Sequence, residues 1–324
     1  MGPVRGRGSR TRGQGDTEDH ELRTLLETTD IRRGEAARAG QLRIGLPKGS
    51  MQAGVLALLA DAGIDIRVGD RNYRPALSWP GFTAKLLKPQ NVVEMLHAGS
   101  RDVGFAGADW VAELDADLVE LLDTGLDPVQ VVAAAPAGRL VDGALPPGRR
   151  LVVASEYARI TQRWIATQTI DAVFVRSYGA TEVFPPEDAD LIVDNTATGS
   201  TLRANGLAIV DTLMRSSTRL YAGRPALDDP ARRGPIEDLV LLLKSVLEAR
   251  RRVMLELNVA EDDFERVVSI LPCMREPTVS RLHGESGYAV RAAVPRTALP
   301  ALLLDIKARG GTDLVVSEPQ QIVP

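Results

Sequence analysis

A short polar stretch after an apolar run carries the residues best suited to bind a phosphorylated sugar. The run Leu191–Val193 ends at Asp194, small hydroxyl-bearing residues then surround Gly199, and a helix-like pattern begins at Thr201. Glycine adopts backbone conformations barred to bulkier residues, so successive N–H groups can converge on an anion while the new helix adds its positive end. This order of strand, tight loop and helix predicts a phosphate-binding loop.

The side chains around this loop narrow the ligand further. The hydroxyls of Thr198, Ser200 and Thr201 can donate hydrogen bonds to phosphate oxygens. Asp194 would repel a phosphate and suits ribose hydroxyls or a bound magnesium ion instead. An acid beside a phosphate-binding loop therefore indicates a sugar phosphate. The same pattern also fits a strand followed by a helix with a Ser/Thr cap, and by itself it does not separate the two.

Two further charged residues lie where an expected strand is followed by an expected helix. Lys48 follows a strand expected over residues 42–46 and precedes a helix expected over residues 55–62. It is a candidate phosphate ligand, or else a solvated loop lysine. Glu182 opens a short helix, where it is either a first-turn acid that suits the helix dipole or an acid facing the ligand.

An open α/β sheet would position all of these residues, because loops at the carboxyl ends of its strands bind ligands. Apolar periodicity predicts strands and helices in alternation. The strands are expected over residues 42–46, 82–87, from 103, 129–135, 151–155, 172–176, 191–193 and 218–222, and the helices over 55–62, 88–97, 159–168 and 236–251. The run Pro136–Gly138 breaks the pattern, and the crossover to a second lobe is expected there. Two α/β lobes joined by crossing strands would enclose a cleft.

The period changes near the end of the chain. Residues 253–316 alternate as strand, helix, strand, strand, helix, strand, which is the ferredoxin-like βαββαβ motif. Few of its polar residues are of catalytic type, so we expect it to regulate or to form oligomers. The domain assignment is a disordered extension over 1–40, lobe I over 42–137 and 217–250, lobe II with the sugar-phosphate loop over 138–216, and the ferredoxin-like domain over 251–324.

Composition excludes several classes of function. The chain has 324 residues, a net charge of −4, a single cysteine and three histidines. An acidic balance argues against a nucleic-acid partner, and Cys273 alone forms neither a disulfide framework nor a metal cluster. No stretch approaches the about 20 apolar residues of a membrane span. We therefore expect a cytoplasmic protein that binds small anions.

Taken together, the motifs resemble the ATP phosphoribosyltransferase family in its long form with a regulatory tail. The resemblance spans residues 42–324 and is most specific in the segment Ile192–Leu207. The other matching segments are Leu46–Gly49, Gly104–Asp109, Gly179–Glu182, Leu271-Pro272 and Pro277-Thr278. The resemblance implies a bilobal unit like a periplasmic binding protein, magnesium dependence, and dimers or hexamers. The implied reaction joins N1 of the adenine of ATP to C1′ of phosphoribosyl pyrophosphate and releases pyrophosphate, with histidine as an expected effector.

The resemblance also implies roles for individual residues. Asp194 would hold the ribose hydroxyls and residues 198–202 the 5′-phosphate, while Lys48 would face the pyrophosphate or the ATP phosphates. Magnesium would be held through the substrate phosphates. With Glu182 as a third catalytic candidate, the other expected substrate contacts are Gly49, Lys88, Gly107, Asp109, Tyr157, Gly179, Thr196, Ala197, Thr198, Gly199, Ser200, Thr201 and Leu202.

The chain departs from the family pattern around the expected acceptor. Lys88-Pro89-Gln90-Asn91 stands where Arg-Pro-x-Asp is common, and Tyr157-Ala158 stands in place of Tyr-Pro. A planar guanidinium thereby becomes a point charge, and an acid becomes an amide. These differences leave open a paralogue that performs the same transfer in a specialised nucleoside pathway of the coformycin or pentostatin type. A non-catalytic anion-binding protein of the same fold is the alternative from a different class.

Overall fold

The computed structural model describes residues 41–69, 73–143, 148, 150–168, 170–284 and 286–323 of the chain. The extension expected over residues 1–40 lies outside this part. The chain divides into two compact units. The first runs up to Gln52 and again over Arg67–Arg232, and the second comprises Ala53–Ile66 and Arg233–Pro324.

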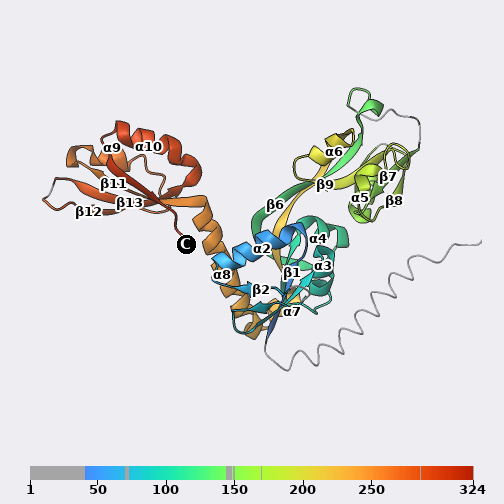
Figure 1. The fold of residues 1–324 in the computed structure, drawn as a ribbon, viewed down its shortest axis with the longest axis horizontal. Coiled ribbons are helices and arrows are strands. Elements are labelled where there is room, and N and C mark those ends of the chain that lie inside the picture. Colours follow the sequence, from blue (N-terminus) through green and yellow to red (C-terminus); the bar gives the residue numbers. More distant parts are fainter. Residues whose placement is uncertain are drawn as a thin grey trace, which may run out of the picture. The chain divides into compact units, whose positions relative to one another are not determined.

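The first unit is built on one eight-stranded sheet with the strand order β4-β1-β5-β10-β6-β9-β7-β8 (Figure 1). Lobe I lies at the β4 end and lobe II at the β8 end. The strands are β1 (Leu42–Pro47), β4 (Phe82–Leu87), β5 (Val103–Gly107), β6 (Leu118–Pro136), β7 (Leu151–Ser155), β8 (Ala172–Arg176), β9 (Leu191–Thr196) and β10 (Leu207–Gly223). Outside this sheet, β2 (Ile66–Arg67) pairs with β3 (Ala76–Leu77).

Lobe I is organised by three parallel strands. β1 pairs in parallel with β4 from Leu42↔Phe82 to Pro47↔Leu87, and with β5 on its other side. All five residues of β5 are buried, as expected of an apolar strand covered on both faces. The helices α3 (Pro89–His97) and α4 (Ala108–Leu114) follow β4 and β5 directly. The loops after β1, β4 and β5 therefore lie at the same edge of the sheet.

Two long strands join the lobes. β6 has 19 residues and β10 has 17, and they pair in antiparallel fashion from Leu207↔Pro136 to Gly223↔Leu118. The expectation of strands confined to residues 129–135 and 218–222 is wrong, because β6 already begins at Leu118 and β10 at Leu207. Register shifts along this pair, including one between Ser216 and Thr218, interrupt the apolar pattern and make one strand look like two.

Lobe II repeats the parallel arrangement. β7 pairs in parallel with β8 and β9, and β9 pairs with the second half of β6. The helix α5 (Ala158–Thr167) follows β7, the 3₁₀ turn η3 (Thr181–Val183) follows β8, and α6 (Ser200–Ala204) follows β9. Because parallel strands end at one edge, the three segments after these strands converge there.

The second unit has its own sheet, of strand order β12-β13-β11-β14, with every neighbouring pair antiparallel. Alternate residues of β11 are buried against its helices, the period expected of a half-covered strand. The elements are β11 (Arg252–Val259), α9 (Phe264–Val268), β12 (Thr278–Arg281), β13 (Tyr288–Pro295), α10 (Leu299–Ala308) and β14 (Thr312–Ser317), with α8 (Pro230–Arg251) preceding them. In this unit, Arg250 of α8 pairs with Asp61, the last residue of α2 (Ser50–Asp61), at 2.7 Å.

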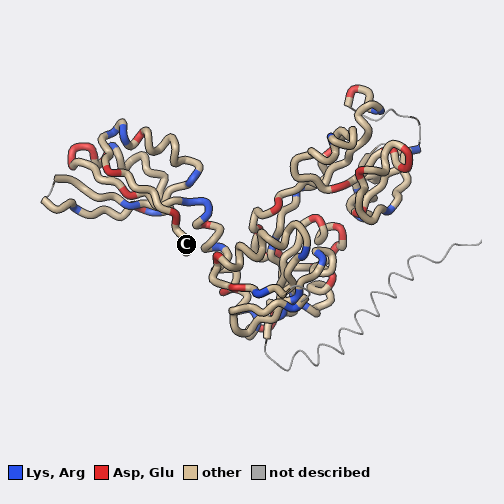
Figure 2. Tube along the Cα trace, in the orientation of Figure 1, with Lys and Arg blue, Asp and Glu red and all other residues tan. Residues whose placement is uncertain are grey.

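These elements confirm the expected fold class, a bilobal α/β unit followed by a ferredoxin-like βαββαβ domain. Figure 2 shows basic and acidic residues interspersed along both units. Among the described residues, no helix is long and apolar enough to cross a membrane.

Candidate functional site

The loop after β9 turns sharply at Gly199. This residue has φ 71° and ψ 7°, the left-handed conformation that glycine adopts at little cost. The turn lets α6 start at Ser200, and the first hydrogen bond of the helix runs from the amide of Arg203 to the carbonyl of Gly199, at 3.0 Å. The amides of Thr201 and Leu202 precede that bond and lie outside the helical ladder. This is the backbone geometry that phosphate-binding loops use.

Hydroxyl groups form hydrogen bonds within the same loop. The amide of Gly199 donates to Oγ1 of Thr196 at 2.9 Å, and the hydroxyl of Thr198 donates to that of Ser200 at 3.0 Å. Thr198 and Ser200 are exposed, whereas the side chain of Leu202 is buried in the core of lobe II. Only the backbone of Leu202 is therefore available to a ligand.

Arg203 is a candidate that the sequence interpretation missed. Its Nη1 donates to the carbonyl of Thr198 at 3.0 Å, and a Cβ added at Gly199 would lie 3.0 Å from the same nitrogen. The guanidinium therefore lies against the loop, and Arg203 is an exposed residue. The spacing in the sequence could have indicated this contact, because a residue four positions after Gly199 returns to the same side of a helix.

Asp194 lies partly buried in the second half of β9. Burial raises the pKa of its carboxyl to about 6. The amide of Asn195, which donates to Oδ1 at 2.7 Å, has the opposite effect and lowers the pKa. The negative charges of Glu182 and Glu156 raise the pKa further. The structure thus brings Glu182 and Asp194 to the same edge of lobe II. A carboxyl whose pKa is raised to about 6, beside a phosphate-type loop, is typical of a ligand-binding site.

The segment before Glu182 is held in a strained turn. Gly179 has φ 103°, and Ala180 has φ 49°, a conformation that residues with a Cβ seldom adopt. The buried hydroxyls of Ser177 and Thr181 hydrogen-bond to each other at 2.8 Å and close the turn. This geometry fixes Glu182 relative to β8.

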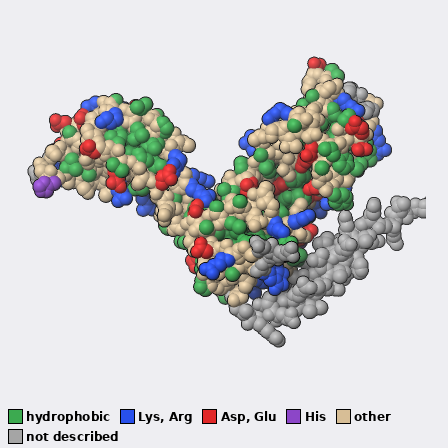
Figure 3. All heavy atoms as spheres, in the orientation of Figure 1, with side chains coloured by type: hydrophobic (Ala, Val, Ile, Leu, Met, Phe, Trp, Pro, Cys, Tyr) green, Lys and Arg blue, Asp and Glu red, His purple; other side chains and the backbone are tan. Residues whose placement is uncertain are grey.

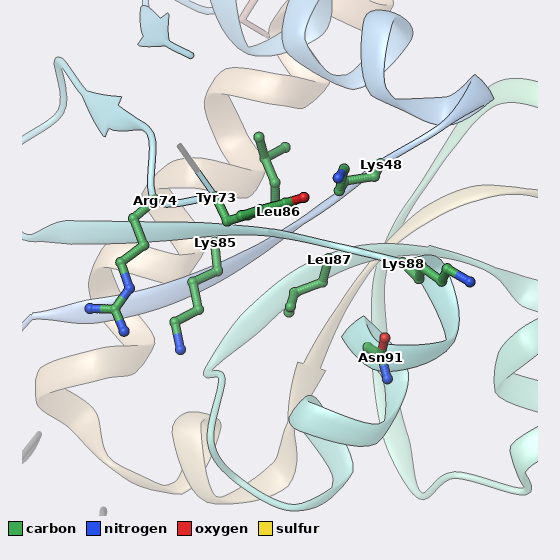
Figure 4. A pocket seen from close by; sticks show the side chains of 8 residues that line it. All are labelled: Lys48, Tyr73, Arg74, Lys85, Leu86, Leu87, Lys88 and Asn91. Atoms are coloured by element: carbon green, nitrogen blue, oxygen red, sulfur yellow. The ribbon is translucent and has the colours of Figure 1, made fainter. Parts of the chain in front are cut away.

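Lobe I contributes a cationic pocket of about 450 Å³ (Figure 4). Four of its eight lining residues are cations and none is an acid. The expected residues Lys48 and Lys88 both line it, Lys48 from the loop after β1 and Lys88 from the residue before α3, while Gly49 continues the first of these loops with φ 85°. The remaining lining residues are Tyr73, Arg74, Lys85, Leu86, Leu87 and Asn91.

Tyr73 lies over Lys48 in this pocket. The ammonium nitrogen is 4.1 Å from the centroid of the aromatic ring, within the range of a cation–π interaction. Tyr73, Arg74 and Lys85 were not anticipated as site residues. Lys85 alternates with buried residues of β4, a pattern that indicates only an exposed strand face, so the sequence carried no specific signal for it.

Three expected substrate contacts, Gly107, Asp109 and Tyr157, are buried in a network between the lobes. Tyr157 is 1% exposed and Asp109 is 5% exposed. The hydroxyl of Tyr157 donates to Oδ2 of Asp109 at 2.6 Å, and that of Ser216 donates to Oδ1 at 2.7 Å. A Cβ at Gly107 would collide with the Asp109 carboxylate, so glycine is required there by a close contact. These side chains contact one another in this structure rather than lining the cationic pocket.

The tyrosine also reaches the loop that carries Asp194. Nδ2 of Asn195 donates to the Tyr157 hydroxyl at 2.8 Å. Burial and the neighbouring Asp109 raise the pKa of the Tyr157 phenol far above its usual value, so it stays protonated and keeps donating. No group of three or more metal-ligating side chains occurs in the described ranges.

Comparison with known protein families points to one enzyme family. A model described as ATP phosphoribosyltransferase matches residues 88–245, and a model described as the HisG C-terminal domain matches residues 249–320. The chain is 34% identical over 290 residues to an ATP phosphoribosyltransferase of Pelotomaculum thermopropionicum, covering 88% of this chain and 100% of that protein. It is 38% identical over 275 residues to one from Chlorobium luteolum, covering 83% and 93%.

A solved structure shares the fold. The ATP phosphoribosyl transferase (HisG:HisZ) complex from Thermotoga maritima contains a chain that aligns with a TM-score of 0.57 and 24% identity, covering 64% of this chain and 99% of that one. At this identity the likeness shows the fold alone.

Proposed function

Because this chain belongs to the ATP phosphoribosyltransferase family, we propose that the lobe II loop binds the phosphoribosyl end of the donor and that the lobe I pocket binds the donor's pyrophosphate or the phosphates of ATP. The chain is a transferase that catalyses the first step of histidine biosynthesis. It moves the 5-phosphoribosyl group of phosphoribosyl pyrophosphate to N1 of the adenine of ATP and releases pyrophosphate. The comparisons favour neither the specialised nucleoside pathway nor the non-catalytic binding protein.

The observation that carries the donor assignment is the turn at Gly199, five positions after Asp194. We place the 5′-phosphate against the amides and hydroxyls of residues 198–202, with the exposed guanidinium of Arg203 beside it. Asp194 accepts hydrogen bonds from the ribose hydroxyls, which a carboxylate does best when ionised. Thr196 and Ala197 shape the loop, and Gly179 with Glu182 closes the far side of the ribose.

We place the phosphates that do not bind to the Gly199 loop in the lobe I pocket. Its cations, Lys48 and Lys88 among them, suit the pyrophosphate of the donor or the phosphates of ATP. Gly49 lets the Lys48 loop turn before α2. We also propose that Gly107, Asp109 and Tyr157 contact the acceptor. Asp109 and Tyr157 would then have to exchange the hydrogen bond between them for bonds to the adenine.

The chemistry needs positioned charges and no covalent nucleophile. The N1 lone pair forms a bond to C1′ of the ribose, while the bond from C1′ to the pyrophosphate oxygen breaks and its electron pair leaves with pyrophosphate. Negative charge therefore grows on the leaving group and positive charge on the ribosyl carbon. Preorganised cations at the pyrophosphate and the anionic Asp194 on the ribose side stabilise that separation.

Magnesium is proposed as the cofactor, held through the substrate phosphates. This form of binding needs few protein ligands, because Mg²⁺ keeps several waters when phosphates are present. Bound there, the ion would supply neutralisation of charge on the departing pyrophosphate.

We further propose that the ferredoxin-like domain mediates assembly into dimers or hexamers and that it responds to histidine. We also propose that the enzyme is cytoplasmic. The exposed apolar side chains of the domain support its role in assembly. Figure 3 shows hydrophobic side chains over the helical part of this domain, and Leu304 of α10 is 74% exposed. Sedimentation of the full chain, with and without histidine, tests assembly, and activity at varied histidine tests the response. A monomer under both conditions would refute the role in assembly, and activity insensitive to histidine would refute the regulatory role.

The site assignment is tested by product formation in the full chain. With ATP, phosphoribosyl pyrophosphate, Mg²⁺ and a pyrophosphatase to draw the reaction forward, we expect phosphoribosyl-ATP. Thr198→Ala should raise KM for phosphoribosyl pyrophosphate, whereas Thr278→Ala, which removes an exposed hydroxyl from β12, should not. Equal KM values in the two variants would remove the loop from the donor site.

A further inference from the structure

Helix α5 of lobe II begins without a side-chain cap of its own. Its N-cap residue is Tyr157, which makes no capping hydrogen bond. The first amides of a helix lack intrahelical partners and need an acceptor. Glu113 of α4, in lobe I, supplies one: Oε1 accepts from the amide of Arg159 at 3.1 Å and Oε2 from the amide of Ile160 at 3.0 Å.

The cap is buried. Glu113 is 6% exposed, and a carboxylate at that depth is costly unless hydrogen bonds stabilise its charge. Two amide donors and the positive end of the α5 dipole do so here. Separating α4 from α5 would leave the carboxylate and both amides without these partners, so this contact resists movement of one lobe against the other.

A second acid on the same face of α4 holds the same helix. Asp109 lies one turn before Glu113, and it accepts the hydrogen bond from Tyr157. The rings of Trp110 and Tyr157 pack at 4.8 Å between their centroids. Because Tyr157 also accepts from Asn195, a continuous set of contacts runs from α4 to the residue beside Asp194. Figure 1 shows α4 and α5 next to each other at the junction of the lobes.

We propose that Glu113 is a positioning residue: by capping α5 across the lobe boundary, it fixes the donor-binding edge of lobe II relative to the cationic pocket of lobe I. This inference rests on the proposed division of substrates between the lobes. Glu113 itself contacts neither substrate. It acts through α5, Tyr157 and Asn195 on the placement of the loop.

This role predicts a particular kinetic signature. Loss of the cap removes no substrate contact, so KM should change less than about threefold. Alignment of C1′ with N1 depends on both lobes, and a displacement of about 1 Å at a reacting centre costs about 100-fold in rate. Loss of the cap should therefore lower kcat about 10- to 100-fold with little effect on KM.

The test compares Glu113→Gln with Asp115→Asn in the full chain. Asp115 pairs with Arg159 and Arg163 of the same helix at 3.0 and 2.8 Å, but it is 54% exposed, and such surface pairs contribute about 0–1 kcal/mol. Both variants remove one negative charge from the lobe I side of this contact. We expect the kcat loss in E113Q alone, after correction for the folded fraction.

A merely structural cap gives a different result. If E113Q lowers the unfolding temperature while kcat per folded enzyme equals that of D115N, or if its only kinetic change is a higher KM, the positioning role is refuted. Should E113Q fail to fold, E113D keeps the charge but is one methylene shorter, and it must show the kcat loss for the role to stand. Failure of the wild-type chain to form phosphoribosyl-ATP would instead refute the proposed function.

Discussion

The phenol of Tyr157, in lobe II, donates a 2.6 Å hydrogen bond to Oδ2 of Asp109, in lobe I. Both residues are almost fully buried, and Ser216 and Asn195 complete the network around them. Buried polar groups that satisfy one another in this way specify a single arrangement of the elements that carry them. The junction of the lobes is therefore a defined contact in this structure as well as a pair of crossing strands.

Removing the Tyr157 hydroxyl should destabilise the catalytic unit. Tyr157→Phe keeps the ring against Trp110 but leaves the Asp109 oxygen without its donor, at a cost of about 1–3 kcal/mol. Thermal unfolding followed by calorimetry measures the change. Tyr178→Phe is the matched control, because Tyr178 is 86% exposed. An unfolding temperature for Y157F equal to that of Y178F would contradict this account of the junction.

Lys48 should act through its charge in the lobe I pocket. Lys48→Ala removes one of four cations there, and loss of a charge-assisted phosphate contact of about 1.5–3 kcal/mol corresponds to roughly a 10- to 100-fold loss in kcat/KM. Initial rates at varied ATP and phosphoribosyl pyrophosphate measure it, with exposed Lys307→Ala as the control. If K48A and K307A have equal kcat/KM, Lys48 is a solvated loop lysine.

Activity should depend on the ionisation of Asp194. Its pKa is raised to about 6, so kcat/KM for phosphoribosyl pyrophosphate should rise with pH through that value as the carboxylate forms. Asp194→Asn should lower kcat/KM and abolish this limb of the profile. An unchanged limb in D194N would assign it to another group, such as the substrate phosphate.

The raised pKa of Asp194 also determines how the stability of the protein changes with pH. A carboxyl whose folded-state pKa lies above its unfolded value contributes stability that is fully present below the unfolded pKa and is lost as pH rises through the folded pKa. The wild-type protein should therefore lose stability relative to D194N between about pH 4 and pH 7. Unfolding temperatures of the two proteins across this range check it, and a constant difference would show that burial does not perturb Asp194.

Local patterns predicted much of this fold. The loop around Gly199, the parallel strands of both lobes and the βαββαβ domain follow from periodicity and glycine placement, which act over a few residues. The two long connecting strands did not follow, because bulges in β10 shift which residues face the core and mask its continuity. The alternation of apolar and polar residues breaks wherever such a shift occurs.

Site residues that lie close together in the sequence were predicted. Site residues that only the fold brings together were missed. Asp194 and Gly199 are only five positions apart along the chain, so a local pattern indicates their chemistry. The cap of α5 by Glu113 joins residues 46 and 47 positions apart, and no local pattern indicates that pairing. Asp109 and Tyr157 were recognised as important, but only the structure shows that they bond to each other.

The donor site is tested most directly by two alanine substitutions at glycines of matched conformation. Gly199 and Gly206 have φ +71° and +70°, and only Gly199 lies against the loop arginine. Both alanines incur the left-handed backbone cost of about 1–2 kcal/mol, so their effects on folding should be similar. We predict that Gly199→Ala raises KM for phosphoribosyl pyrophosphate about 10-fold or more, the effect of roughly 1.4 kcal/mol of lost binding, whereas Gly206→Ala leaves it within about twofold. Equal KM values for the two variants would contradict the assignment of the Gly199 turn as the phosphate-binding loop.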